Sequence, residues 1–152
     1  MIYPRSLQKS VVFTPGIVKP DTALTDAYFP LSTLFIDTKG YDHCGFYIHL
    51  GTIADALTFA VFQDTSATVT GSVKALTGAT FTIVATDDGG YFFLEFNTAK
   101  LDSANGFRYV TCKVTGTSGS NYAEIAFFGL HARSEPVTQS AYCLASSVNL
   151  GG

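Results

Sequence analysis

The sequence predicts an all-β protein, an antiparallel β-sandwich of jelly-roll-like type with about eight strands. Short segments alternate with a period of two, as in Y-F-F-L-E-F-N at residues 91–97, and successive strand side chains point to opposite faces. Turn signals rich in Gly, Asp, Ser and Thr recur every 8–12 residues, which favours a sandwich over βαβ units. Only residues 98–103 leave room for a helical turn.

The expected strands lie in a body of residues 27–133. In chain order they span residues 32–37, 43–51, 57–63, 67–74, 79–85, 91–97, 107–115 and 121–131. Turns between them include Thr77-Gly78 and Asp87-Asp88-Gly89-Gly90. Residues 1–26 and 134–152 are predicted to be extended arms. The first arm contains three prolines, which disfavour a central strand, and the second is rich in Ser, Ala and Gly.

The parity of apolar residues predicts the core. One face of each of five expected strands contributes to it, and burying each side chain contributes about 1.5–3 kcal/mol. The last strand differs because Ile125 and Phe127 lie on one face while Phe128 and Leu130 lie on the other. Such a strand is either central between two layers or at a contact between subunits. The predicted core residues are Cys44, Phe46, Ile48, Leu50, Leu57, Phe59, Val61, Phe81, Ile83, Phe92, Leu94, Phe96, Val110, Cys112 and Val114.

The composition argues for close association and against several classes of partner. Charged residues make up 14% of the chain, against roughly 25% in an average domain. A surface of hydroxyl groups is cheaper to bury than a surface of ions. The net charge is −3 and no run of Lys or Arg occurs, which excludes a nucleic-acid partner. No apolar segment approaches the ~18 residues of a membrane span, and no signal peptide is visible.

The three cysteines predict neither a metal site nor a disulfide framework. Cys44, Cys112 and Cys143 are far apart and form no C-x-x-C pair. Cys44 and Cys112 align with apolar neighbours, so they are expected to be small buried residues. This usage is typical of a protein made in a reducing cytoplasm.

No catalytic, cofactor-binding or metal-binding residues are predicted. His43 and Cys44 are adjacent in a strand and point to opposite faces, so they cannot act as base and nucleophile. His43 and His49 share a face but lie ~20 Å apart at about 3.3 Å per residue, too far for one metal ion. The segment Asp87-Asp88-Gly89-Gly90 lacks the ligand spacing of a calcium loop and is expected to form a hairpin turn.

Three tyrosines are the candidates for a binding surface. Tyr47, Tyr91 and Tyr109 occupy the predicted outer faces of their strands. On one sheet they would form a platform for a sugar or a protein, or they would form cross-strand pairs that stabilise the sheet. A glycan-binding module is therefore one alternative function, although Trp is absent from the chain.

Two blocks of sequence carry a resemblance to a known family. The first contains I-D-T-K-G-Y-D at residues 36–42 and L-T-F-A-V-F-Q-D at 57–64, with a strand and a linker between them. The second contains F-R-Y-V at 107–110 and ends in H-A-R-S-E-P-V at 131–137. In this order the blocks resemble small β-rich structural proteins encoded in the head-gene regions of tailed phages and prophages.

The resemblance covers residues 36–137 and implies a virion protein without enzyme activity. A capsid decoration (cement) or minor head protein is expected, with a tail or head–tail connector protein as the alternative. Its implied partner is the major capsid protein, and its implied location is the capsid surface after synthesis in the host bacterial cytoplasm.

The chain is also expected to associate with copies of itself, as a trimer. Arms that reach across neighbouring subunits add avidity, because tethering makes each further contact intramolecular. The residues expected at assembly contacts are Val11, Val12, Phe13, Tyr47, Tyr109, Phe127, Phe128, Pro136 and Val137.

Overall fold

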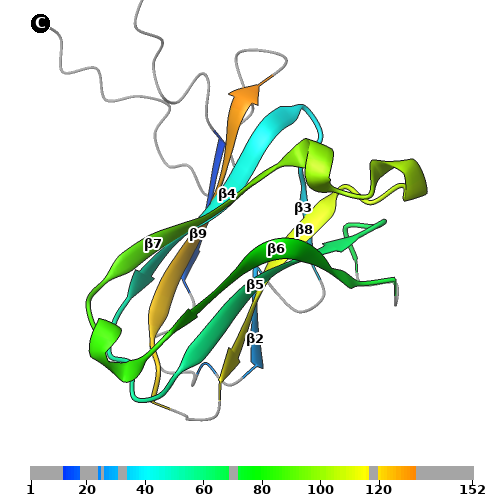
Figure 1. Cartoon of the computed structure of the whole chain (residues 1–152). Helices are drawn as coiled ribbons and strands as arrows, with labels where there is room; N and C mark the ends of the chain where they lie inside the picture. Colours follow the sequence, from blue (N-terminus) through cyan, green and yellow to red (C-terminus); the bar gives the residue numbers. More distant parts are fainter. Residues whose placement is uncertain are drawn as a thin grey trace, which may run out of the picture.

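The computed structural model describes residues 12–17, 24, 26–30, 34–68, 72–116 and 120–132, and these form two antiparallel sheets packed face to face (Figure 1). The predicted all-β sandwich is confirmed. The strands are β1 (Val12–Ile17), β2 (Asp26–Phe29), β3 (Ile36–Asp37), β4 (Tyr41–Leu50), β5 (Leu57–Asp64), β6 (Lys74–Ile83), β7 (Tyr91–Asn97), β8 (Tyr109–Gly116) and β9 (Ala123–Ala132).

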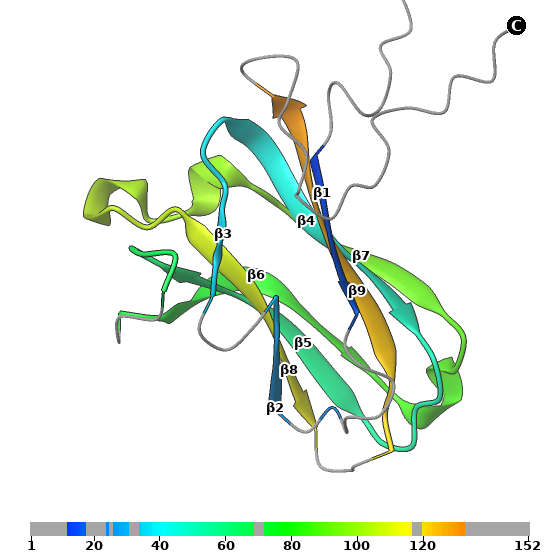
Figure 2. The ribbon, with the colours of Figure 1, turned by 180° about the vertical axis from the view of Figure 1, so that it is seen from behind.

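The strand order is that of a jelly roll. The first sheet has the order β1-β9-β4-β7, and the second has the order β2-β8-β5-β6. β2 and β3 pair with successive parts of β8, so together they fill one strand position and the sandwich has eight positions. Figure 2 shows both layers from behind, with β1 beside β9 at the edge of the first sheet.

Aromatic rings from both sheets meet in the core. Phe46 of β4 contacts Phe127 of β9 with ring centroids 5.5 Å apart, and it contacts Phe29 of the second sheet at 6.1 Å. Phe59 of β5 packs edge-on against Phe92 of β7 at 5.2 Å. The Phe46–Phe29 and Phe59–Phe92 contacts connect the two layers, and all three pairs have the T-shaped geometry that aromatic pairs favour.

The core predicted from parity is confirmed except at one position. Most of its members are buried, and Phe92 is half-buried and packed against the cluster. Phe81 is the exception, with 49% of its surface exposed. It lies on β6, an edge strand, where its ring closes one side of the sandwich against Phe92 at 4.8 Å.

One predicted strand boundary is wrong. The expected strands 67–74 and 79–85 are replaced by the single strand β6. The expected turn at Thr77-Gly78 lies inside β6, where Gly78 adopts a φ of 82° and the register with β5 shifts between Ala60 and Phe62. A bulge can contain the same residues as a turn, because both use a glycine with positive φ.

Part of the expected N-terminal arm belongs to the sandwich. Residues Val12–Ile17 form β1, which pairs with β9 along the edge of the first sheet. Pro15 is compatible with this position because an edge strand leaves one side of its backbone unpaired. The other residues of both expected arms, apart from residues 24 and 26, lie outside the described residues, so the domain division remains a prediction.

The segment between β6 and β7 is a turn, but not a hairpin. It contains the 3₁₀ helix η1 (Ala85–Asp87) and connects strands of different sheets. The Asp87 carboxylate accepts a hydrogen bond from the Val84 N–H at 2.9 Å, and Asp88 accepts one from the Ile53 N–H at 2.6 Å. The two carboxylates therefore fix loops at this end of the sandwich.

Two further 3₁₀ turns occur where a helical turn was expected. They are η2 (Thr98–Lys100) and η3 (Ser103–Asn105), and they follow β7. Within the described residues, no helix has the length and apolar character needed to cross a membrane.

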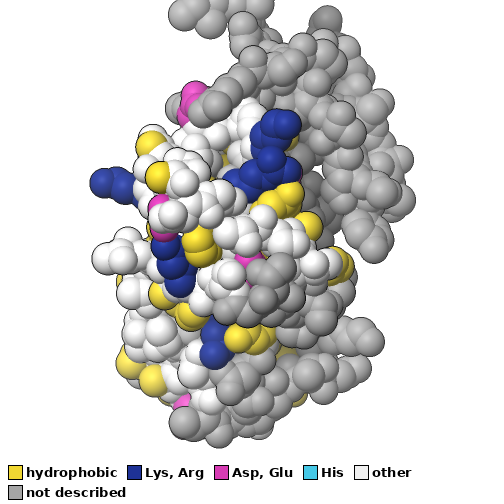
Figure 3. Space-filling view, turned by 90° about the vertical axis from the view of Figure 1, so that its right-hand side faces the viewer, with side chains coloured by type: hydrophobic (Ala, Val, Ile, Leu, Met, Phe, Trp, Pro, Cys, Tyr) yellow, Lys and Arg dark blue, Asp and Glu magenta, His cyan; other side chains and the backbone are white. Residues whose placement is uncertain are grey.

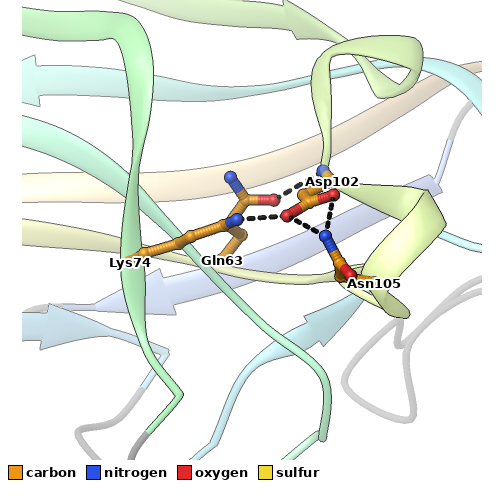
Figure 4. A network of polar contacts seen from close by, with 4 residues as sticks. All are labelled: Gln63, Lys74, Asp102 and Asn105. Atoms are coloured by element: carbon orange, nitrogen blue, oxygen red, sulfur yellow. Dashed lines mark hydrogen bonds and ion pairs between the residues drawn. The ribbon is translucent and has the colours of Figure 1, made fainter.

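A polar network holds η3 against the second sheet (Figure 4). The Asp102 carboxylate accepts hydrogen bonds from Lys74 of β6 and from Asn105 at 2.9 Å. The Asp102 backbone N–H donates to Gln63 of β5 at 3.0 Å. The hydrogen bonds from Lys74 and Asn105 hold the pKa of the Asp102 carboxyl below its ordinary value, because they stabilise its charged form.

We expect Phe46→Ala to lower the free energy of unfolding by about 3–5 kcal/mol, because it removes a ring that touches both sheets and leaves a cavity. Urea unfolding of the full chain measures the loss. The matched control is Phe93→Ala, at a ring that is 54% exposed, for which we expect a loss of about 1 kcal/mol. Equal losses would contradict this account of the core.

We expect Asp102 to make stability depend on pH in the acid range. Its pKa is lower in the folded chain than in the unfolded chain, so its contribution is fully present above the unfolded pKa and is lost as the pH falls through the folded pKa. Thermal unfolding of the wild type and Asp102→Asn at a series of pH values tests this. The difference between the two proteins should shrink with falling pH, and a constant difference would contradict the assignment.

Candidate assembly surface

The outer face of the first sheet carries a cluster of aromatic rings. Tyr47 of β4 lies between Tyr91 and Phe93 of β7, with ring centroids 6.1 and 5.3 Å away. Phe93 also contacts Phe128 of β9 at 6.0 Å. We call these four residues the aromatic face. Tyr91 is 67% exposed and Phe93 is 54% exposed, so the apolar side chains reach solvent at the β7 edge.

Phe128 is the buried end of the aromatic face. Its ring lies over Gly45 of β4, where an added Cβ would come within 2.6 Å of the ring. Phe128 and Gly45 are directly opposite in the β4–β9 register, and the missing side chain lets the ring lie against the sheet. Only 6% of Phe128 is exposed as a result. β9 therefore lies inside the first sheet, between β1 and β4, and is apolar on both faces.

The four strands of the first sheet contain no Lys or Arg. They contain all three histidines of the chain, and two of these lie near carboxylates on the outer face. His43 Nε2 is 3.2 Å from Glu95 Oε2, and His49 Nδ1 is 3.6 Å from Glu124 Oε2. The aromatic face is thus flanked by one His–Glu pair at each end of β4.

Among the described residues, the basic side chains lie on the second sheet or in the segments that connect the two sheets. Figure 3 shows a side of the molecule on which Lys and Arg side chains lie among hydrophobic and uncharged ones. Three of them stack on aromatic rings, at cation-to-centroid distances of 4.2 to 5.5 Å. These pairs are Lys74 with Phe107, Arg108 with Tyr109, and Lys113 with Tyr28. The two outer faces of the sandwich therefore differ in charge.

The structure separates the residues that were expected at assembly contacts. Tyr47 and Phe128 lie on the aromatic face. Tyr109 lies on the second sheet, so the three tyrosines do not form one platform. Phe127 faces the core and is 1% exposed, which removes it from the outer surface of a single copy.

The remaining expected contacts fall at the ends of the chain. The backbone of Val12 and Phe13 pairs with Gly129 and Phe128 in β9. Val11, Pro136 and Val137 lie outside the described residues. Tyr91 and Phe93 extend the surface toward β7. Phe93 was missed because it lies between two core residues in a strand that is apolar at nearly every position.

The candidate nucleophile is inert in this fold. Cys44 and Cys112 are both free and fully buried, as predicted, and burial raises the pKa of each thiol to about 12. Both thiols are therefore protonated at neutral pH, whereas the thiolate is the reactive form. His43 lies on the outer face beside Glu95 instead of beside Cys44. The described residues contain no group of three potential metal ligands.

No protein-family model matches the sequence, and no curated protein is similar to it. Among solved structures, a chain of the Bacillus endospore appendages, described as disulfide-linked pili, is 17% identical, with a TM-score of 0.43 over 87% of this chain and 97% of that chain. A chain of Broad Bean Stain Virus is 11% identical, with a TM-score of 0.36 over 91% and 94%. At these scores neither similarity assigns a function.

We expect Gly45→Ala to destabilise the chain by about 1–3 kcal/mol, because the new methyl group would overlap the Phe128 ring and approach the Leu94 carbonyl oxygen. The measurement is the free energy of unfolding. The control is a rescue: Phe128→Leu in the Gly45→Ala background should restore part of the lost stability. Gly40→Ala is not a suitable control, because Gly40 has a positive φ. Full stability of Gly45→Ala alone would contradict the described packing.

Proposed function

We propose that this chain is a non-enzymatic structural protein of a phage virion, a capsid decoration protein that docks on the head shell. The observation that carries this proposal is the aromatic face, with Tyr91 and Phe93 exposed on a sheet that has no Lys or Arg. Exposed apolar clusters on a folded domain mark contact sites. The proposed partners are the major capsid protein and further copies of this chain.

Three other properties are consistent with a non-enzymatic assembly role. The low content of charged residues reduces the cost of burying the surface against a neighbour. The thiols of Cys44 and Cys112 have raised pKa values, so these two residues supply no nucleophile at neutral pH. Jelly rolls occur in viral capsid domains and also in lectins, so the fold is compatible with this role without selecting it.

A glycan-binding role receives less support from the geometry. The proposed sugar platform required Tyr47, Tyr91 and Tyr109 on one surface, and Tyr109 lies on the opposite sheet with Arg108 over its ring at 4.8 Å. Only Tyr47 and Tyr91 of the three tyrosines remain on one face, where Tyr47 packs against Tyr91 and Phe93.

Quantitative mass spectrometry of purified particles tests the proposal. We expect a copy number comparable to that of the major capsid protein. A few copies per particle would instead place the chain in the tail or the head–tail connector, and complete absence would contradict a virion role.

A binding experiment tests the proposed surface. We expect Phe93→Asp to weaken binding of the chain to undecorated shells at least about tenfold, because it places a charge in an apolar contact. Ala104→Asp adds the same charge at an exposed position in η3, away from the aromatic face, and should bind like the wild type. Equal binding of all three proteins would remove the aromatic face from the contact.

A further inference from the structure

Exposed apolar side chains concentrate on one side of the sandwich. Of the five large hydrophobic residues that are exposed in the described part of the chain, four lie on β6, on β7 or directly after β6. They are Phe81, Val84, Tyr91 and Phe93. β6 and β7 are the edge strands of the two sheets, and the Phe81–Phe92 contact joins them on this side. A partner that covered this side would remove most of the exposed apolar surface at once.

β7 has few of the features that usually protect an edge strand from pairing, and its one charged residue is Glu95. Native edges are blunted by prolines, lysines, bulges or short length. β1 contains Pro15, β6 contains Lys74 and an irregular register, and β2 and β3 are four and two residues long. β7 has seven residues in continuous register with β4 and contains no Pro, Gly or Lys.

The backbone of β7 presents hydrogen-bonding groups at this edge that no described strand pairs with. Leu50 N–H donates to the Gly90 carbonyl at 2.8 Å, so the carbonyl of Gly90 points toward β4. Peptide groups alternate along an antiparallel strand. The groups of Phe92, Leu94 and Phe96 therefore point toward β4, while those of Tyr91, Phe93 and Glu95 point away from it. The described residues contain no strand that pairs with this second side of β7.

We propose that two copies of this chain associate by antiparallel pairing of β7 with β7 of the second copy, which joins their two first sheets into one continuous sheet. A register centred on Phe93 places Phe93 opposite Phe93 of the second copy and Glu95 opposite Tyr91. It forms about six backbone hydrogen bonds. No like charges face each other, whereas a register centred on Glu95 would oppose two carboxylates.

This pairing identifies the surface through which two copies of the chain contact each other. It rests on the proposed function only in the statement that contacts between copies take part in assembly. It has twofold symmetry, so it differs from the trimer expected from the sequence. A ring with an odd number of copies cannot pair every β7 with another β7.

Sedimentation of the full chain tests the pairing. Between about 1 μM and 1 mM, we expect the mass to rise from 16.2 kDa to twice that value. Glu95→Pro removes an edge-facing N–H and should raise the dissociation constant at least about tenfold. Glu95→Ala also loses the carboxylate but keeps the N–H, so it should still form dimers. A monomer at all concentrations, a trimer, or dimers of Glu95→Pro as stable as those of the wild type would overturn the proposal.

Hydrogen exchange of the unmodified chain covers the case in which Glu95→Pro fails to fold. The amides of Tyr91, Phe93 and Glu95 should exchange at least about tenfold more slowly at high than at low protein concentration. The amide of Phe92 serves as the internal control, because it already faces β4. Concentration-independent exchange at all three positions would overturn the pairing.

A chain that is monomeric but binds shells would retain the proposed function, and a chain that dimerises but is absent from particles would retain only the pairing.

Discussion

The structure depends on the pairing of β4 with β9, because these two neighbouring strands have to be covered on both faces. Their inner faces supply Phe46 and Phe127, which meet in the core at 5.5 Å. On the outer face, Phe128 lies over Gly45, which shields one ring with a backbone that has no side chain. β7 has no equivalent packing of a ring over a glycine, and Phe93 is 54% exposed there. The large apolar side chains in the interior of the first sheet are therefore buried within one copy, whereas Phe93 at the β7 edge is exposed.

The sequence was sufficient for the fold class and most of the core, because period-two alternation reports directly which side chains share a face. It was insufficient for features that depend on the backbone conformation or on the order of strands in the sheets. The sequence at Gly78 predicts a turn, whereas its positive φ belongs to a bulge within β6. Tyr47 and Tyr109 were assigned to outer faces, but parity carries no information about which sheet a strand joins. The exposure of Phe81 follows from the position of β6 at an edge, which only strand order reveals.

The candidate surface was partly visible in the sequence. Tyr47 and Phe128 were expected at contacts, and both lie on the aromatic face. Phe127 was assigned with its neighbour and lies in the core instead, because adjacent residues of a strand face opposite ways. The distribution of charge supports the same surface. The first sheet has no Lys or Arg, whereas Lys74 and Lys113 of the second sheet stack on rings. The outer face of the first sheet therefore combines exposed aromatic rings with two His–Glu pairs and no Lys or Arg.

A cryo-electron microscopy reconstruction of particles that carry this chain tests the central claim most directly, because it shows which surface is buried in the assembled state. Our account predicts that the aromatic face, including Tyr91 and Phe93, is covered by protein in every well-ordered copy. It would be contradicted by copies that expose this face to solvent and contact the particle through the second sheet alone.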